Sequence, residues 1–163
     1  MQTTCADCGR PLSHHDRHVR YGLPDPVLAS GVEPGASGFW MSHATPSDSV
    51  MMQVDGVGAF VRALLPTNLT GGYTVTFGVW VGISPDDLRR VFDSWWAPEY
   101  VDLRVEGVLA NDVAPWAVFA SPVQLGVRDP DSTPYCVSSS NPVLQDVLDR
   151  VWPHELVLAA IPQ

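Results

Sequence analysis

The segment Tyr73–Ser84, YTVTFGVWVGIS, constrains the fold more than any other part of the sequence. Its bulky apolar side chains recur at every second position, which is the period of a β-strand with one buried face. The first face consists of Val75, Phe77, Val79, Val81 and Ile83, and the second of Thr74, Thr76, Gly78, Trp80 and Gly82. The sequence therefore predicts a sheet whose core lies on the first face.

A helix is predicted directly after this strand. Ser84 is a favourable N-cap residue, Pro85 suits the first turn, and the acidic pair that follows lies near the positive end of the helix dipole. Apolar residues then recur at helical spacing, which predicts one stripe facing the core. The stripe consists of Leu88, Val91, Phe92, Trp95 and Trp96. Pro98 is expected to end the helix.

The remaining sequence predicts further strands and a second amphipathic helix. Strands are expected over residues 58–66, 103–109, 118–127 and 134–138. A helix capped by Asn141 is expected over 141–152, and 155–161 is either a last strand or a continuation of that helix. This pattern is typical of the α+β class, with a mainly antiparallel sheet and two amphipathic helices on one face. Residues 23–163 would form this domain, after a metal knuckle in residues 1–22.

Residues 23–49 are rich in proline, glycine and serine and show no hydrophobic period. We expect this segment to be irregular, with one helical turn near Val27. Irregular segments of this length are uncommon inside a compact domain and often serve function. Trp40 and His43 lie in this segment and are therefore candidates for a functional site.

Charge and hydropathy exclude several classes of protein. The formal net charge is −9, and the nine basic residues are all arginine. Nucleic-acid binding requires basic patches that neutralise phosphates, so a nucleic-acid partner is not expected. No run approaches the ~20 apolar residues that span a bilayer, and the N-terminal residues lack the apolar core of a signal peptide. We therefore expect a cytoplasmic protein without a membrane partner.

The stretch CADCGRPLSHHDRH contains two of the three cysteines and three of the five histidines of the chain. Cys5 and Cys8 have the spacing that lets one tight turn present two thiolates to a zinc ion. His14 and His18 are four residues apart, so that one helical turn would place both on the same side. The sequence predicts a structural zinc site formed by these four residues.

Alternatives to this zinc site remain open. His15 or His43 could supply a ligand, and the stretch could also be a solvated tail without metal. A thioredoxin-like redox pair is not expected, because that motif follows a core strand, which four preceding residues cannot form. Cys136 lies among apolar residues of a predicted strand and is expected to be a buried thiol.

Several motifs in order resemble a bacterial family known as domain of unknown function 2199. They are Cys5-x-x-Cys8-Gly9, Phe60-x-Arg62 before Leu65-Pro66, Phe77-Gly78-Val79-Trp80-Val81-x-Ile83-Ser84, and Gly107-x-Leu109-Ala110-Asn111. The resemblance implies a fold family and no particular activity. Two departures remove candidate ligands or catalytic groups. This chain has Asp48-Ser49-Val50 where the family carries a further cysteine, and Ser139-Ser140-Asn141-Pro142 where it carries Thr-Asp-His-Pro.

Two strand residues are candidates for ligand binding. Arg62 lies between apolar residues, and a buried arginine must pair with a structural carboxylate, such as Asp55, or receive an anionic ligand. Trp80 stands among glycines, which leave space beside its ring for a flat ligand or for another core element. We expect residues 23–49 to fold over Trp80 and bring His43 toward Arg62.

Two functional hypotheses of different classes follow from these residues. The first is a zinc-binding accessory or binding module, because no phosphate loop, nucleophile elbow or metalloprotease motif is present. The second is a small enzyme of isomerase or cyclase type in bacterial specialised metabolism. It would bind substrate through Trp40, Arg62 and Trp80 and transfer protons through His43 or Glu106. The first hypothesis does not identify the small molecule or protein that the module binds. The second does not identify the substrate of the enzyme.

Overall fold

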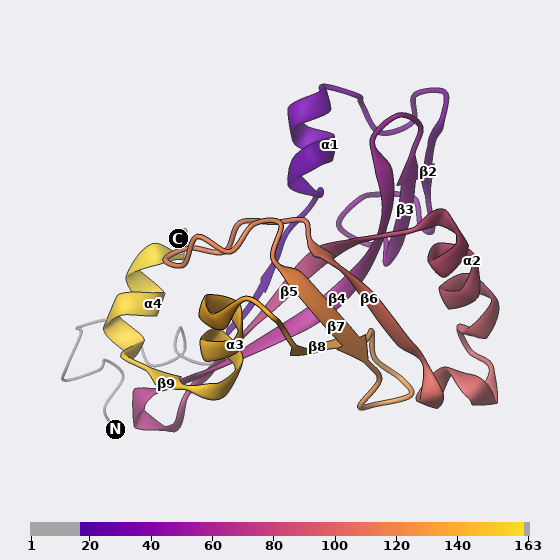
Figure 1. Cartoon of the computed structure of the whole chain (residues 1–163). Coiled ribbons are helices and arrows are strands. Elements are labelled where there is room, and N and C mark those ends of the chain that lie inside the picture. Colours follow the sequence, from indigo (N-terminus) through magenta and orange to yellow (C-terminus); the bar gives the residue numbers. More distant parts are fainter. Residues whose placement is uncertain (1–16, 162–163) are drawn as a thin grey trace.

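A computed structural model describes residues 17–161 and shows a five-stranded β-barrel with added strands and helices (Figure 1). The barrel strands are β4 (Gly58–Leu69), β5 (Thr74–Ile83), β6 (Arg104–Leu109), β7 (Pro122–Gly126) and β8 (Tyr135–Ser138). Successive strands pair antiparallel, and a parallel pairing of β8 with β4 closes the ring. The α+β class and the predominance of antiparallel pairing are confirmed, and the closure of the sheet into a barrel is a feature that the sequence analysis did not predict.

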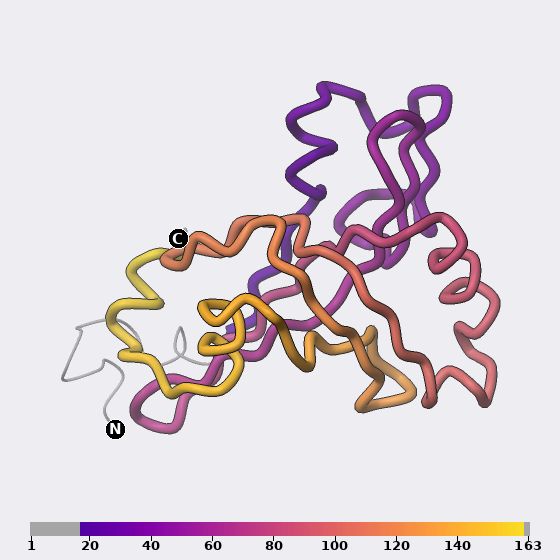
Figure 2. Tube along the Cα trace, viewed as in Figure 1, coloured from indigo at the N-terminus to yellow at the C-terminus, as the bar shows by residue number. Residues whose placement is uncertain are grey.

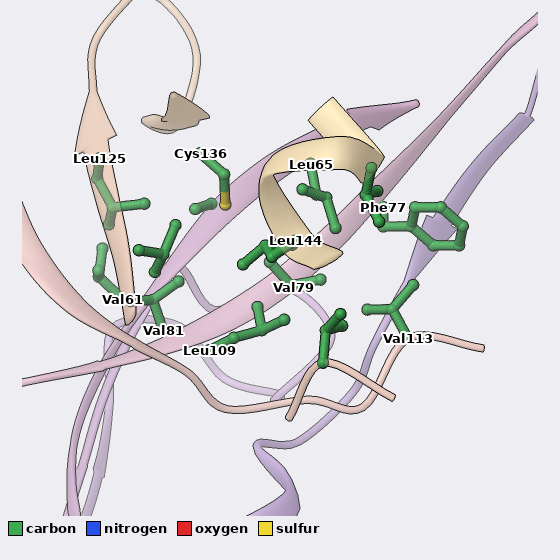
Figure 3. Close-up of a cluster of buried hydrophobic side chains, with 14 of the residues drawn as sticks. Val61, Leu65, Phe77, Val79, Val81, Leu109, Val113, Leu125, Cys136 and Leu144 are labelled. Carbon is green, nitrogen blue, oxygen red and sulfur yellow. The ribbon is translucent and has the colours of Figure 1, made fainter. Parts of the chain in front are cut away.

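The longest pairing in the barrel joins β4 to β5 and positions both faces of the predicted strand. Their register runs from Ala59 opposite Ile83 to Asn68 opposite Thr74, with Arg62 opposite Trp80. The apolar face of β5 lies inside the barrel, as expected from its alternation. Figure 3 shows that side chains of β4 and β5 share this core with Leu109 of β6, Leu125 of β7 and Cys136 of β8.

Four further strands extend the sheet beyond the barrel. β3 (Met51–Val54) pairs antiparallel with β4, and β2 (Phe39–Met41) pairs with β3. β1 (Arg17–Arg20) lies parallel to β5, and β9 (Val151–Trp152) lies parallel to β4. The described part of residues 1–22 therefore contributes a strand to the same sheet.

Four α-helices and two 3₁₀ segments complete the described chain. They are α1 (Asp25–Ser30), α2 (Pro85–Ser94), α3 (Pro142–Asp149), α4 (His154–Ala160), η2 (Thr70–Gly72) and η3 (Pro98–Asp102). The predicted caps are confirmed, since the Ser84 side chain accepts from the Asp87 N–H and the Asn141 side chain from the Val143 N–H. None of the described helices has the length and apolar character needed to cross a membrane.

The arrangement of the helices corrects the expectation of two helices on one face. α2 lies at one side of the barrel, while α3 and α4 lie at the opposite side (Figure 1). Leu144 of α3 and Leu158 of α4 enter the barrel core. Residues 155–160 belong to α4, a helix separated from α3 by β9, so they form neither a last strand nor a continuation of the preceding helix. A closed sheet has no single open face for helices to cover, and its helices therefore distribute around it.

A second hydrophobic core lies on the outer face of β4 and β5. It consists of Val27, Met52, Val54, Phe60, Trp80 and Ala110, with partly buried neighbours from residues 21–57. The expected helical turn near Val27 is α1, and this helix inserts Val27 into the core. The segment predicted to be irregular thus covers the Trp80 face of the sheet, with α1, β2 and β3 gathered at one end of the molecule (Figure 1).

Candidate functional site

Arg62 and Trp80 form a buried cross-strand pair, in which Trp80 belongs to the second core. Neither side chain is exposed to solvent, and the Arg62 guanidinium carbon lies 4.2 Å from the centre of the Trp80 ring. The guanidinium donates to four backbone carbonyls: Nε to Ser49 at 2.9 Å, Nη1 to Tyr21 at 2.7 Å and to Gly78 at 3.0 Å, and Nη2 to Pro46 at 3.0 Å. Of the two alternatives for Arg62, a pairing with Asp55 or another acid is therefore wrong, because Arg62 forms no ion pair with a described residue and donates to carbonyl oxygens.

Burial is the main cause that lowers the pKa of Arg62, to about 9, and the neighbouring charge of Arg20 lowers it further. Arg62 therefore stays protonated at neutral pH. Its four carbonyl partners each place a negative partial charge against the guanidinium, which compensates part of its lost hydration. These carbonyls come from three separate stretches of chain, at Tyr21, at Pro46 and Ser49, and at Gly78, so the main structural effect of Arg62 is to join the three stretches.

Trp80 is held by polar contacts as well as by packing. Its Nε1 donates to the Gly22 carbonyl at 3.2 Å, and its backbone N–H donates to Asn111 Oδ1 at 2.8 Å. The Asn111 amide group in turn donates to the Leu23 carbonyl and to Asp25 Oδ1, both at 3.0 Å. The motif residues Trp80 and Asn111 thus attach residues 22–25 to the barrel. Trp80 is therefore packed against another core element and does not form the wall of an open cavity.

A cavity of another kind lies beside the end of α2. Its volume is about 560 Å³, within the range of small-molecule sites. Three segments line it: Ser42, His43, Asp48, Val50 and Met51 before and in β3; Phe92, Trp95, Trp96 and Tyr100 from α2 to η3; and Pro130, Asp131, Ser132 and Thr133 between β7 and β8. Figure 2 shows the β7–β8 loop returning beside η3, where Tyr100 Oη donates to the Ser132 carbonyl at 2.6 Å.

Aromatic side chains form much of the cavity wall, and they correct the predicted stripe of α2. Leu88 and Val91 are buried as predicted, but Phe92 is 55% exposed and Trp96 is 80% exposed. α2 ends at Ser94, after which Trp96 adopts a left-handed φ of 70° and leaves the helical direction. Trp95 is partly buried and packs on Tyr100 of the barrel core, with ring centres 4.9 Å apart. Of the predicted stripe, Leu88, Val91 and Trp95 therefore contact the core, whereas Phe92 and Trp96 are exposed at the cavity.

The polar part of the wall comes mainly from the loop before β3. The His43 N–H donates to Ser49 Oγ at 3.2 Å, and His43 Nδ1 lies 3.0 Å from Ser42 Oγ. Asp48 accepts from Thr45 Oγ1 at 2.9 Å. The Ser49 carbonyl is also a partner of Arg62, which connects the buried guanidinium to the loop carrying His43. Arg62 itself does not line the cavity.

The remaining predicted site residues lie apart from this cavity. Trp40 is 41% exposed on β2 and packs edge-on against Phe92, with ring centres 6.1 Å apart. Glu106 is exposed on β6 and accepts from Gln124 Nε2 at 3.2 Å, in a groove on another side of the barrel. The predicted combination of Trp40, Arg62, Trp80, His43 and Glu106 is thus distributed over several places.

The predicted metal site falls mostly outside the described residues. Cys5, Cys8 and His14 precede residue 17, and His18 is an exposed residue of the strand β1, so the helical turn considered for His18 is wrong. Within residues 17–161, no three histidine, cysteine or acidic side chains are grouped so that they could hold a metal ion. Cys136 is a buried thiol, as predicted, and burial raises its pKa to about 12.

Sequence reasoning missed the cavity because its lining residues look like parts of other features. Trp95 and Trp96 continue a helical stripe, and residues 130–133 belong to an ordinary turn. The available signal was the width of that stripe: two adjacent tryptophans just before Pro98 exceed what one short helix can bury against a sheet.

Comparison with known proteins identifies the family. Residues 4–144 match the model of a family described as "Uncharacterized protein conserved in bacteria (DUF2199)". The chain belongs to this family. Searches of curated proteins and of solved structures give no match. The DUF2199 match includes the Arg62–Trp80 pair and Asn111, which join the two cores, and it ends before β9 and α4.

Proposed function

We propose that this DUF2199 protein is a binding module that takes a small organic ligand in the cavity beside the end of α2. The observation that carries the proposal is Trp96, which is 80% exposed on the cavity wall while its backbone adopts a φ of 70°. Among the described residues, Ala120 is the other non-glycine residue with positive φ.

Two costs at Trp96 support a functional role for this position. The left-handed conformation costs a non-glycine residue roughly 1–2 kcal/mol. An exposed indole ring beside exposed Phe92 also leaves apolar area in water that folding alone would tend to bury. A ligand enclosed between Trp96, Phe92 and the loop of His43 would remove this area from water. The cavity volume suits a ligand of metabolite size.

Ligand-observed NMR with a set of indole, benzyl and cyclohexyl fragments tests the proposal. Fragments should bind the parent protein and lose binding in Trp96→Ala, whereas Phe119→Ala should bind like the parent. Phe119 is a suitable control because it is an exposed aromatic residue that does not line this cavity. Equal fragment binding by both folded variants would contradict the proposed site.

An acid/base enzyme is the second candidate, because His43 lies in the wall of the same cavity as two carboxylates. A histidine beside carboxylates can transfer protons near neutral pH. The two candidates differ in the fate of the ligand. A binding module returns a bound compound unchanged, whereas an enzyme converts it, and His43→Gln would abolish this conversion while retaining binding. Mass spectrometry of a compound recovered after incubation distinguishes these outcomes.

We also propose that Cys5, Cys8, His14 and His18 bind a structural zinc ion. The support is the Cys-x-x-Cys spacing followed by Gly9 and by two histidines four residues apart. Elemental analysis of tag-free protein should give close to one zinc per chain, and Cys5→Ser with Cys8→Ser should remove it. Unchanged zinc in that double variant would place the metal elsewhere, and zinc-free parent protein would refute the proposal.

A further inference from the structure

The charges around the cavity point to the class of ligand. Its lining contains two carboxylates, Asp48 and Asp131, and no arginine. Asp48 lies before β3 and Asp131 between β7 and β8, so that the two charges come from different walls. Both side chains are exposed, and neither forms an ion pair with a described residue. The cavity therefore presents two negative charges, and no described cation contacts either of them directly.

The guanidinium of Arg20, which interacts electrostatically with Asp48, is already bound by backbone carbonyls. Arg20 is close enough to Asp48 for the carboxylate to raise the pKa of Arg20, although burial lowers that pKa by more. Its guanidinium donates to the carbonyls of Ser47 and Ser49, and Arg20 does not line the cavity. Arg62 is likewise surrounded by carbonyls and closed off from solvent. Neither arginine can therefore serve as an anion-binding group in this cavity.

The aromatic wall complements the carboxylates. Aromatic ring faces carry negative partial charge and attract organic cations, most strongly in the case of tryptophan. Trp95, Trp96, Tyr100 and Phe92 line the same space as the two carboxylates. A strongly hydrated ammonium ion gains little from such rings, whereas an alkylated ammonium group gains both apolar contact and electrostatic attraction.

We propose that the cavity selects a small organic cation, with an alkylated ammonium head and an apolar body. This inference rests on the proposed binding function of the same cavity. The rings enclose the apolar surface of the ligand, and Asp48 and Asp131 balance its charge. Anionic ligands are rejected, because they would meet two like charges in a protein whose formal net charge is −9.

Three probes of similar size test the charge dependence by isothermal titration or NMR. They are the cation (3-hydroxyphenyl)trimethylammonium, its neutral isostere 3-tert-butylphenol, and the anion 3-hydroxybenzoate. We expect the cation to bind about tenfold more tightly than the neutral isostere at low salt. The anion should show no binding, and added salt should reduce the preference for the cation.

A pair of double variants tests the source of this preference. Asp48→Asn with Asp131→Asn should reduce it to less than about threefold, whereas Asp86→Asn with Asp93→Asn should retain it. The second pair removes the same formal charge from exposed positions of α2 that do not line the cavity. Circular dichroism should show that both double variants remain folded.

The outcomes separate the two proposals. If 3-tert-butylphenol binds as tightly as the cation, or if Asp48→Asn with Asp131→Asn leaves the preference unchanged, the charge selectivity is refuted while the binding site stands. If none of the three probes binds the parent protein and the fragment set also fails, the cavity is not a binding site and both proposals are wrong.

Discussion

Replacement of Arg62 by methionine should destabilise the protein, because the backbone carbonyls that accept hydrogen bonds from Arg62 would lose this donor. Methionine retains much of the apolar stem against Trp80 but leaves four acceptors without the guanidinium. The Tyr21 carbonyl has Arg62 as its donor and no second donor among the described residues. The other three keep one: Gly78 accepts from the Tyr21 N–H, Pro46 from the Ser49 N–H, and Ser49 from Arg20 at 3.5 Å.

The expected loss follows from these partners. One buried carbonyl without a donor costs about 1–3 kcal/mol, and each of three weakened sites adds about 0.5 kcal/mol. Relief of the buried charge offsets part of this sum, although removing one partner of a buried charged contact is generally destabilising. We therefore expect Arg62→Met to lower the free energy of unfolding by about 2–4 kcal/mol.

Urea denaturation followed by tryptophan fluorescence and far-UV circular dichroism measures this loss. Arg89→Met is the matched control, because Arg89 is exposed on α2, and it should change the free energy by less than about 0.5 kcal/mol. A loss below about 1 kcal/mol in Arg62→Met would refute the structural role. If that variant instead kept its stability and lost ligand binding, Arg62 would be a ligand anchor.

Three further predictions concern packing, thiol reactivity and pH. In urea denaturation, Leu88→Ala should lower the free energy of unfolding by about 2–4 kcal/mol, because Leu88 is buried. Phe92→Ala should lower it by less than about 1 kcal/mol, because Phe92 is mostly exposed. Equal losses in the two variants would contradict this packing. Cys136 in a Cys5→Ser, Cys8→Ser background should react with a thiol reagent only after unfolding, and reaction in native buffer would show that the barrel core opens. Burial raises the pKa values of Cys136, Tyr21 and Tyr100, so the unfolded state releases these three protons first and stability should fall as pH rises. The lowered pKa of Arg62, about 9, acts in the opposite direction, but the three other groups together outweigh it above about pH 10. The urea midpoint should therefore fall as pH rises from about 10 to about 12, and a constant midpoint there would contradict this.

The elements that follow from local rules were predictable from the sequence. β5 has strict alternation, and α2 and α3 begin at residues with both a side-chain cap and a following proline. The burial of Cys136 also followed from its apolar neighbours. In each case the signal lies within about ten residues, so it does not depend on the path of the rest of the chain.

The closure of the barrel and the position of the cavity depend on distant contacts. Closure rests on the single described pairing of Leu64 with Tyr135, which are 71 positions apart in the sequence, and no local pattern announces it. The partners of Arg62 were missed for a related reason. A sequence reveals acids that could pair with an arginine, but backbone carbonyls occur at every residue and carry no signal.

The buried Arg62 connects the stability of the fold to the shape of the cavity. Its Nε and Nη2 hold the carbonyls of Ser49 and Pro46, which belong to the loop in front of β3. Ser49 Oγ accepts from the His43 N–H and donates to the Thr45 carbonyl at 2.7 Å, so the same loop is fixed from both sides. A loop that is already held by hydrogen bonds loses less conformational entropy on ligand binding than a flexible loop does. The long segment 23–49 therefore combines two tasks, because its first part covers Trp80 with a second core and its last part forms a preorganised wall of the cavity.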